Sequence, residues 1–390
     1  MKSCFRIPRL LLPQKQADME KWAVISAHAF SSDRSYWERI SRIVGNTPST
    51  LGMILPAVYL GEEDEERQKE IRENMYAALE TDTLEKFVRG FVLTVRETAA
   101  GLRRGIVAAI DLEDFTSGRN EMSPIRPASE TDAARVQALL KLRRSTPIEL
   151  AEAVVLYRDK RDRVIKSLKR EDLERVYDFD LMEGGGHIAG FFLPEYISQE
   201  LILDLNDRSD PCFAVAEGGE AVAAAKAHWD EVKLGLSLDE RKNHPARFCL
   251  VELQNLCDDA VELLPVHRLV TDIDAEAFCD FFTRAVKCKR KGHLLYPALA
   301  GGAEAVTLVD GLIEKFVRAN TGRVKYLCDE EEIEKRSSEE GCVGVVLKGI
   351  DKDDLFARLK GGGVFPKNTF SLGGEQDKRY YIEGREISYD

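Results

Sequence analysis

Five basic side chains at scattered positions could together bind an anion. Arg126 follows a predicted loop, Arg268 lies in a predicted strand, Lys367 follows a glycine-rich stretch, and Lys378 and Arg379 begin the last predicted strand. An arginine can hold a carboxylate or phosphate through two parallel hydrogen bonds, and a lysine adds a point charge. The alternative is that each cation forms an ordinary ion pair, and only convergence in space would favour an anion pocket.

His267 is a candidate for proton transfer. It lies between Val266 and Arg268 in a predicted strand, where the alternation of side chains places His267 and Arg268 on opposite faces. An imidazole at this position could act as a general base or donate to a phosphate. A structural histidine, with its hydrogen bonds made inside the fold, is the open alternative.

Asp178 and Asp180 are candidates for a metal site. They are two residues apart, so their carboxylates lie on one face of a predicted strand. Such a pair could hold Mg²⁺ or share a proton. Gly184, Gly185 and Gly186 follow, which predicts a hairpin. The two aspartates could therefore simply orient that hairpin.

The composition indicates an acidic globular protein. The 390 residues are 44% hydrophobic and 32% charged, with a formal net charge of −12, and the length allows two or three packed units. Negative charge disfavours nucleic-acid binding, and the short basic cluster at Lys287–Lys291 is better explained as a solvated helix end. Cysteines without metal-ligand spacing and the lack of a long apolar run predict a cytoplasmic protein outside the membrane. Nothing in the composition indicates an oligomeric state.

The apolar pattern predicts strands and helices in irregular alternation. A strand is expected over Trp22–Ala27, a helix over Ser35–Val44, a long helix over Glu62–Val92 and a pair of strands over Ala153–Leu168. Because hairpins are mixed with isolated helices, the pattern favours an α+β fold with mixed, mostly antiparallel sheets. Two closely packed lobes, residues 1–170 and 171–390, are expected.

An ordered set of short stretches carries a resemblance that extends from about Met19 to Ile387. The stretches are Trp22–Ile25, Tyr36–Trp37, Ile110–Glu113, Tyr177–Met182, Pro245–Phe248, Leu250–Glu252, Pro265–Arg268 and Phe365–Gly373. In this order they resemble the DUF1015 family of proteins of unknown function. The resemblance implies a fold similar to the ParB/sulfiredoxin superfamily, whose members bind nucleotides and include a free-serine kinase. It thereby implies nucleotide-dependent phosphoryl chemistry, by analogy of fold alone.

The family usually carries D-G-N-H or D-G-H-H at a turn between a strand and a helix, and this chain has Glu217–Gly218–Gly219–Glu220 there. The resemblance implies that the backbone of Gly218 and Gly219 binds phosphate at the helix start. Glu220 stands where the family has a histidine, and like charges ~4 Å apart repel by ~4 kcal/mol at an effective dielectric near 20. Mg²⁺ held by Glu217 and Glu220 would remove that repulsion. A solvated turn, where acids are favoured in any case, is the alternative.

Two functional hypotheses follow. The first is an enzyme that uses a nucleoside phosphate and Mg²⁺ to move a phosphoryl group on a small serine-like or phosphoserine-like metabolite. Its assigned residues are His267 and Glu217 for catalysis, Arg126, Arg268, Lys367, Gly218 and Gly219 for phosphate, and Asp178, Asp180 and Glu220 for the metal. The second is a degenerate, non-catalytic ligand-binding or regulatory protein with the same fold. Nucleic-acid binding by analogy with ParB is disfavoured by the net charge.

Overall fold

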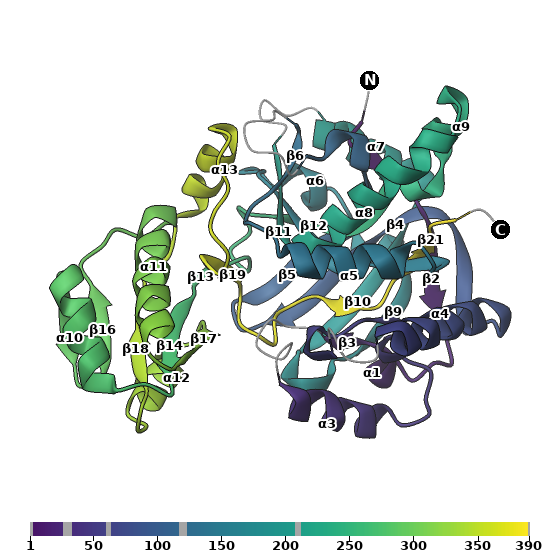
Figure 1. Ribbon diagram of the computed structural model, residues 1–390. Helices are drawn as coiled ribbons and strands as arrows, with labels where there is room; N and C mark the ends of the chain where they lie inside the picture. The colour runs from purple at the N-terminus through teal and green to yellow at the C-terminus, as the bar shows by residue number, and fades with distance from the viewer. Residues whose placement is uncertain (1–2, 26–32, 60–63, 117–122, 207–211, 389–390) are drawn as a thin grey trace.

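The chain folds into a large body built on one extended sheet and a smaller body beside it, joined by extended segments (Figure 1). The computed structural model describes residues 3–25, 33–59, 64–116, 123–206 and 212–388. Within those ranges no helix combines the length and the apolar character needed to cross a bilayer. Sheets and helices are intermixed and most strand pairs are antiparallel, which confirms the expected α+β class.

The large sheet has twelve strands among the described residues, in the order β6-β11-β8-β12-β5-β4-β2-β21-β7, with β1 beside β5 and β10 and β9 extending from β4. Its strands are β1 (Phe5–Arg6), β2 (Arg9–Pro13), β4 (Leu84–Thr98), β5 (Gly101–Asp111), β6 (Ile125–Pro127), β7 (Ile148–Leu150), β8 (Ala153–Tyr157), β9 (Glu174–Asp180), β10 (His187–Pro194), β11 (Phe213–Glu217), β12 (Phe248–Asn255) and β21 (Gly384–Glu386). The pairs β6·β11 and β8·β12 are parallel.

The helices of the large body are α1 (Met19–Trp22), α3 (Arg34–Val44), α4 (Asp64–Glu80), α5 (Ala133–Arg143), α6 (Arg163–Lys166), α7 (Glu195–Asn206), α8 (Gly219–Val232) and α9 (Leu238–Asn243). Helices α5 and α8 lie against each other. The inner face of α8 is apolar, and Val222, Ala225 and Trp229 join the core formed with β5, β8 and β12. This burial holds α8 in place against the sheet.

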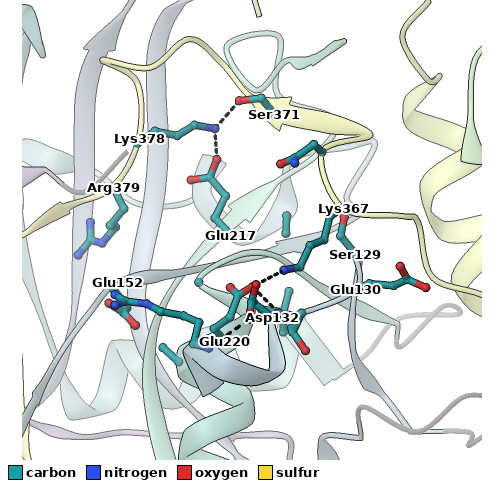
Figure 2. Close-up of a pocket in the computed structure, with 18 of the residues that line it drawn as sticks. Ser129, Glu130, Asp132, Glu152, Glu217, Glu220, Lys367, Ser371, Lys378 and Arg379 are labelled. Carbon is teal, nitrogen blue, oxygen red and sulfur yellow. Dashed lines mark hydrogen bonds and ion pairs between the residues drawn. The ribbon is translucent and has the colours of Figure 1, made fainter. Parts of the chain in front are cut away.

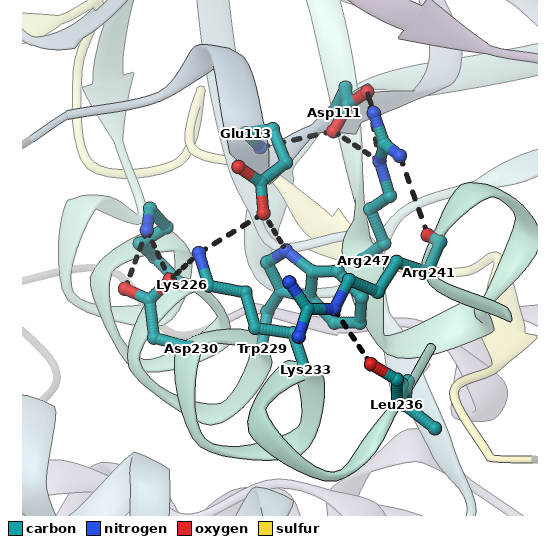
Figure 3. Close-up of polar contacts among 9 residues, drawn as sticks. All are labelled: Asp111, Glu113, Lys226, Trp229, Asp230, Lys233, Leu236, Arg241 and Arg247. Atoms are coloured by element: carbon teal, nitrogen blue, oxygen red, sulfur yellow. Dashed lines mark hydrogen bonds and ion pairs between the residues drawn. The ribbon is translucent and has the colours of Figure 1, made fainter. Parts of the chain in front are cut away.

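Polar contacts lock the second half of α8 to the end of β5 (Figure 3). Glu113, just after β5, accepts hydrogen bonds from Nε1 of Trp229 at 2.6 Å and from Nζ of Lys233 at 3.1 Å. Asp111, the last residue of β5, pairs with Arg247 at 2.6 Å. Because the C-terminal half of α8 is fixed by these contacts, its N-terminal turn is held in one position next to β11 and β8.

The smaller body is a five-stranded sheet covered by helices, in the order β15-β16-β18-β14-β17. Its elements are β14 (His267–Thr271), α10 (Ala275–Ala285), β15 (Cys288–Lys291), β16 (Leu294–Pro297), α11 (Ala303–Ala319), β17 (Arg323–Leu327), α12 (Glu330–Ser337) and β18 (Val343–Val345). Phe278 and Phe282 of α10 and Phe316 of α11 form its aromatic core. This body has a core of its own.

The chain then returns from the smaller body to the large one. Helix α13 (Lys352–Lys360) is followed by β19 (Phe370–Leu372), which pairs with β13 (Leu263–Pro265), and β20 (Tyr380–Tyr381) pairs with β3 (Val24–Ile25). Strands from before and after residue 170 share the twelve-stranded sheet. The expected boundary between lobes at residue 170 is therefore corrected, because it runs through that sheet. The separate body consists instead of β14 to β18 with their helices.

Three expected elements have different boundaries. The helix expected over Glu62–Val92 ends at Glu80, and β4 begins at Leu84, with Asp82 between them at a φ of 54°. The strand pair expected over Ala153–Leu168 is β8 followed by the short helix α6. The strand expected over Trp22–Ala27 is β3 alone after α1, and Ala27 lies outside the described residues. The helix predicted over Ser35–Val44 is confirmed, with Gly45 after it at a φ of 58°. The ParB/sulfiredoxin-like element stays a prediction.

Candidate functional site

A cleft of about 510 Å³ opens where β11 ends and where α5 and α8 begin (Figure 2). The returning segment before and after β19 forms the facing wall. The polar and charged residues that line it are Ser129, Glu130, Thr131, Asp132, Arg135, Glu152, Glu217, Glu220, Tyr326, Cys328, Lys367, Asn368, Ser371, Glu375, Lys378, Arg379 and Tyr381. Segments far apart in the sequence therefore contribute to one cavity of a size typical for small-molecule sites.

The start of α8 is open toward this cleft. Gly218 takes a left-handed φ of 67° at the N-cap, and no side chain caps the helix. A Cβ on Gly218 would lie 2.6 Å from Cα of Ala153, so only glycine fits. The first N–H groups of a helix have no partner within the helix, and they carry its positive dipole end. The turn can therefore accept a negatively charged group.

The start of α5 is closed by side chains of the protein itself. Oδ1 of Asp132 accepts hydrogen bonds from the N–H of Ala134 at 2.9 Å and of Arg135 at 3.2 Å. Nζ of Lys367 reaches Oδ2 of Asp132 at 2.9 Å, and Oε1 of Glu220 accepts from the N–H of Asp132 at 3.0 Å. Lys367 also lowers the pKa of Asp132 by donating to it. Of these two helix starts, only that of α8 is free for an anion.

Lys378 extends from the facing wall toward the end of β11. Its ammonium pairs with Glu217 and donates to Oγ of Ser371 at 2.5 Å and to the carbonyl of Leu372 at 3.1 Å. The side chains of Lys378 and Glu217 are 13% and 17% exposed, so the pair is largely withdrawn from water. A charge pair at this depth acts in a lower dielectric than a surface pair does.

Glu152 is another acid that lines the cleft. Burial raises the pKa of its carboxyl above the ordinary value of 4.5, although the nearby Arg135 and a hydrogen bond from Tyr381 act in the opposite direction. The hydroxyl of Tyr381 donates to Oε2 at 2.7 Å. Nη1 of Arg135 is buried and makes no hydrogen bond. A carboxyl with a raised pKa beside an unused guanidinium donor is an arrangement suited to proton transfer.

Carboxylates outnumber cations along the cleft. Its acids are Glu130, Asp132, Glu152, Glu217, Glu220 and Glu375, and its bases are Arg135, Lys367, Lys378 and Arg379. The charge of Arg379 is already neutralised within the fold, because its buried guanidinium pairs with Glu252 and Glu383. A polyanion entering the cleft would therefore need a compensating cation.

Three of the sequence-predicted residues lie away from this cleft. His267 is buried, and its Nδ1 accepts a hydrogen bond from the N–H of Leu347 at 3.2 Å. Burial, with a contribution from Arg268, lowers the pKa of His267 to about 4. Arg268 holds Asp310 with two hydrogen bonds of 2.7 and 2.9 Å. Arg126 is buried and donates to the carbonyl of Leu359 at 2.5 Å. The expected gathering of these three residues with Lys367 around one hollow does not form.

Asp178 and Asp180 also lie elsewhere, on β9. Both accept from the ring of His187, Asp180 at 2.7 Å and Asp178 at a shorter distance, and Asp178 also pairs with Arg175. These two aspartates and Glu220 are not brought together. In the described ranges, no group of three or more His, Cys, Asp or Glu side chains is arranged so that it could hold a metal ion. Of the predicted site residues, the cleft brings together Glu217, Gly218, Gly219, Glu220 and Lys367.

Sequence reasoning did not single out Glu152, Arg135 or Tyr381. Glu152 is the one acid within the apolar run Leu150–Leu156, and a single charge inside such a run is a usable signal, since burying it requires a partner. Arg135 and Tyr381 gave no signal, because each lies in a segment of ordinary polar composition. Their proximity to Glu152 arises from the packing of α5 and β20 beside β8.

Comparison with known proteins places the chain in a family. The family model described as "Protein of unknown function (DUF1015)" matches residues 11–352. No curated protein matches.

Among solved structures, a free serine kinase in complex with AMP is 9% identical, with 72% of this chain and 92% of that chain covered and a TM-score of 0.41. A conserved hypothetical protein from Pyrococcus furiosus is 11% identical, with 71% and 95% covered and a TM-score of 0.37. SbnI from Staphylococcus aureus, truncated at its C-terminus, is 8% identical, with 69% and 84% covered and a TM-score of 0.36. Similarity at this level carries no functional assignment.

Proposed function

The chain belongs to the DUF1015 family, and from the geometry of its own cleft we propose that it binds a nucleoside phosphate and transfers a phosphoryl group to a small hydroxyl compound. The observation that carries the proposal is the uncapped start of α8, formed by a glycine turn that no other residue fits, with Lys378 facing it across the cleft. Backbone N–H groups at a helix start, together with a lysine, form a recurrent phosphate site.

The phosphates would lie on the N–H groups of Gly219 and Glu220, with Lys378 as the counter-charge. Lys378 is already oriented by Ser371 and by Glu217, so it can turn from the carboxylate to a phosphate without crossing the cleft. The excess of acids requires a compensating cation. Oxygen ligands are the type that Mg²⁺ prefers, and it commonly takes one or two protein carboxylates with the phosphates completing its shell. Glu217 and Glu220 fit that role.

Glu152 would remove the proton from the acceptor hydroxyl. As the hydroxyl oxygen bonds to the terminal phosphorus, its proton passes to Glu152, and the bond from that phosphorus to the bridging oxygen breaks, which releases the shortened nucleotide. A carboxylate whose pKa is raised above the ordinary value is a stronger base than an ordinary one. The buried Nη1 of Arg135 could bind a carboxylate of the acceptor, which suits a serine-like metabolite.

A binding protein without turnover is the second candidate. The observation in its favour is that Lys367 and Lys378 are already neutralised by Asp132 and Glu217. Such internal pairs reduce the affinity for phosphate but do not prevent regulatory binding of a ligand.

Calorimetric titration with ADP, ATP and CTP, each with and without Mg²⁺, tests the binding step. The same mixtures with serine or other small hydroxyl compounds are then followed by ³¹P NMR for transfer. We expect nucleotide binding that Lys378→Met weakens at least tenfold, while Lys348→Met, at an exposed position outside the cleft, leaves it unchanged. Binding without any new phosphoester would favour the second candidate. No binding by any nucleotide would rule out the phosphotransferase proposal.

A further inference from the structure

A second cavity, of about 620 Å³, lies between α3, the loop after it, and α4. It shares no lining residue with the cleft described above. One side is apolar, formed by Val44, Met53, Ile54 and Ile71, all of which are buried. The size is that of a small-molecule site and far exceeds the space needed for a single trapped water.

Two buried donors beside this cavity make no hydrogen bond. Trp37 of α3 is only 2% exposed, and its Nε1 has no acceptor. Nε of Arg67, in the first turns of α4, is also buried without a partner. Both residues line the cavity. A buried donor without an acceptor is costly, and native proteins rarely leave two around one cavity.

The walls of the cavity are fixed by the fold. Nδ2 of Asn74 in α4 donates to the carbonyl of Gly52 at 3.0 Å, which ties the helix to the loop. A Cβ on Gly52 would lie 2.9 Å from that Nδ2, so a larger residue would displace the Asn74 amide. The guanidinium of Arg67 lies 4.1 Å from the ring centre of Tyr59, which orients it. These contacts fix α4 and the loop around the cavity and orient Arg67.

The charges around the cavity indicate which ligand it fits. Arg67 and Glu70 are its only charged lining residues among those described, and Glu70 is exposed at the rim whereas Arg67 is half-buried. Val44 and Gly45, at the C-terminus of α3, also line the cavity, and the helix dipole is negative there and disfavours a dianion. A ligand with one negative charge and an apolar body matches both features.

We propose that this cavity binds a small amphipathic carboxylate. The carboxylate accepts hydrogen bonds from Arg67 and Trp37, and the apolar part packs on Met53, Ile54 and Ile71. A guanidinium and an indole N–H are both donors without acceptor capacity, so they complement an ionised carboxylate and not an ammonium group.

The proposal is tested by NMR titration, which follows the indole N–H signals of protein labelled with ¹⁵N-tryptophan. The nitrogens of Trp22 and Trp229 are already bonded, to the carbonyl of Ile382 at 3.0 Å and to Glu113 at 2.6 Å, so only Trp37 has an unused donor. The three resonances are assigned with single Trp→Phe variants. Hexanoate and benzoate are the probes, hexanol and benzyl alcohol are their uncharged controls, and inorganic phosphate is the dianion control.

We expect hexanoate or benzoate to shift the Trp37 resonance saturably, and the alcohols to bind at least tenfold more weakly. Arg67→Met should weaken carboxylate binding at least tenfold, while Arg72→Met, the same change on α4 outside the cavity, should not. Melting curves of both variants verify that they fold. The proposal is overturned if neither carboxylate moves the Trp37 signal, if Arg67→Met and Arg72→Met bind alike, or if phosphate competes better than the carboxylates do.

Discussion

The backbone N–H of Asp132 donates to Oε1 of Glu220 at 3.0 Å, and this single contact joins the first turns of α5 and α8 at the mouth of the cleft. Glu220 thereby has a structural partner, which its position in the sequence did not reveal. Asp132 in turn caps α5 and binds Lys367. The carboxylates of Glu220 and Asp132 therefore connect the first turns of α5 and α8 to each other and to Lys367 of the returning segment.

Replacing Glu220 separates its structural role from its charge. Glu220→Ala removes the acceptor for Asp132, and we expect the free energy of unfolding to fall by roughly 0.5–1 kcal/mol, since the contact is exposed. Glu220→Gln keeps an acceptor oxygen and should retain that stability. Both changes remove a negative charge beside the phosphate position, so both should strengthen binding of ADP without Mg²⁺. Urea denaturation and calorimetry measure the two effects, and equal stability of Glu220→Ala and wild type would contradict the first.

Gly218→Ala should damage both the fold and the cleft. The left-handed φ of 67° and the 2.6 Å approach to Cα of Ala153 leave no room for a Cβ, so we expect a loss of roughly 1–3 kcal/mol of stability. Gly311→Ala is the matched control, because Gly311 lies inside α11 with open space at its Cβ position. That change should stabilise the protein by up to about 1 kcal/mol. Urea midpoints that fall by the same amount in both variants would show that the turn does not require glycine.

Variants of the Lys378–Glu217 ion pair can separate an effect on the stability of the protein from an effect on nucleotide binding. Lys378→Met leaves Glu217 largely buried without its cation, and we expect a loss of roughly 1–3 kcal/mol. Adding Glu217→Gln removes the unpaired charge and should restore much of that stability. It should not restore nucleotide binding, because the phosphate counter-charge is still missing. A double variant that regains nucleotide affinity would show that Lys378 acts only as a structural partner.

Glu152→Gln should stabilise the protein at neutral pH while it abolishes transfer. The folded state raises the pKa of Glu152 above 4.5, so the unfolded chain releases this proton first and the fold loses stability as the pH rises from 4.5 to the folded pKa. The loss is absent below about 4.5 and constant above the folded pKa. The stability gained by Glu152→Gln should therefore grow as the pH rises above 4.5 and become constant once the pH exceeds the folded pKa. Phosphoryl transfer should fall about 100-fold or more, with nucleotide affinity retained. Unchanged turnover would exclude Glu152 as the base.

His267 should make the protein sensitive to acid without affecting catalysis. Its pKa is lowered to about 4 in the folded state, so the unfolded chain binds the proton first as the pH falls below 6.5. Stability contributed by the neutral ring is lost progressively between pH 6.5 and 4, by roughly 2–3 kcal/mol.

His267→Gln should remove that part of the pH dependence, whereas His228→Gln removes a separate part, because the pKa of His228 is also lowered to about 4. Unfolding curves at several pH values measure both. A loss of phosphoryl transfer in a well-folded His267→Gln variant would instead support a catalytic role.

The sequence by itself determined the family, the α+β class and those elements whose local signals agree. The helix at Ser35–Val44 and the strand, glycine turn and helix from Phe213 to Val232 are examples, because the apolar pattern and the glycine positions favour the same structure there. The prediction from sequence was wrong where the pairing partners are distant along the chain, as for the strand that begins at Leu84. Local periodicity does not indicate that this strand pairs with β2, β5 and β10.

Only the tertiary structure decided which charges share a cavity. Lys367, Lys378 and Glu217 meet in the cleft because the chain crosses to the smaller body and returns, whereas Arg126, Arg268 and His267 are buried in other contacts. Residue type limits the chemistry that a side chain can perform, but whether its charge faces a ligand or a fixed partner depends on long-range packing. Glu152 shows the same principle, since its raised pKa results from burial beside β8 and from neighbours on distant segments.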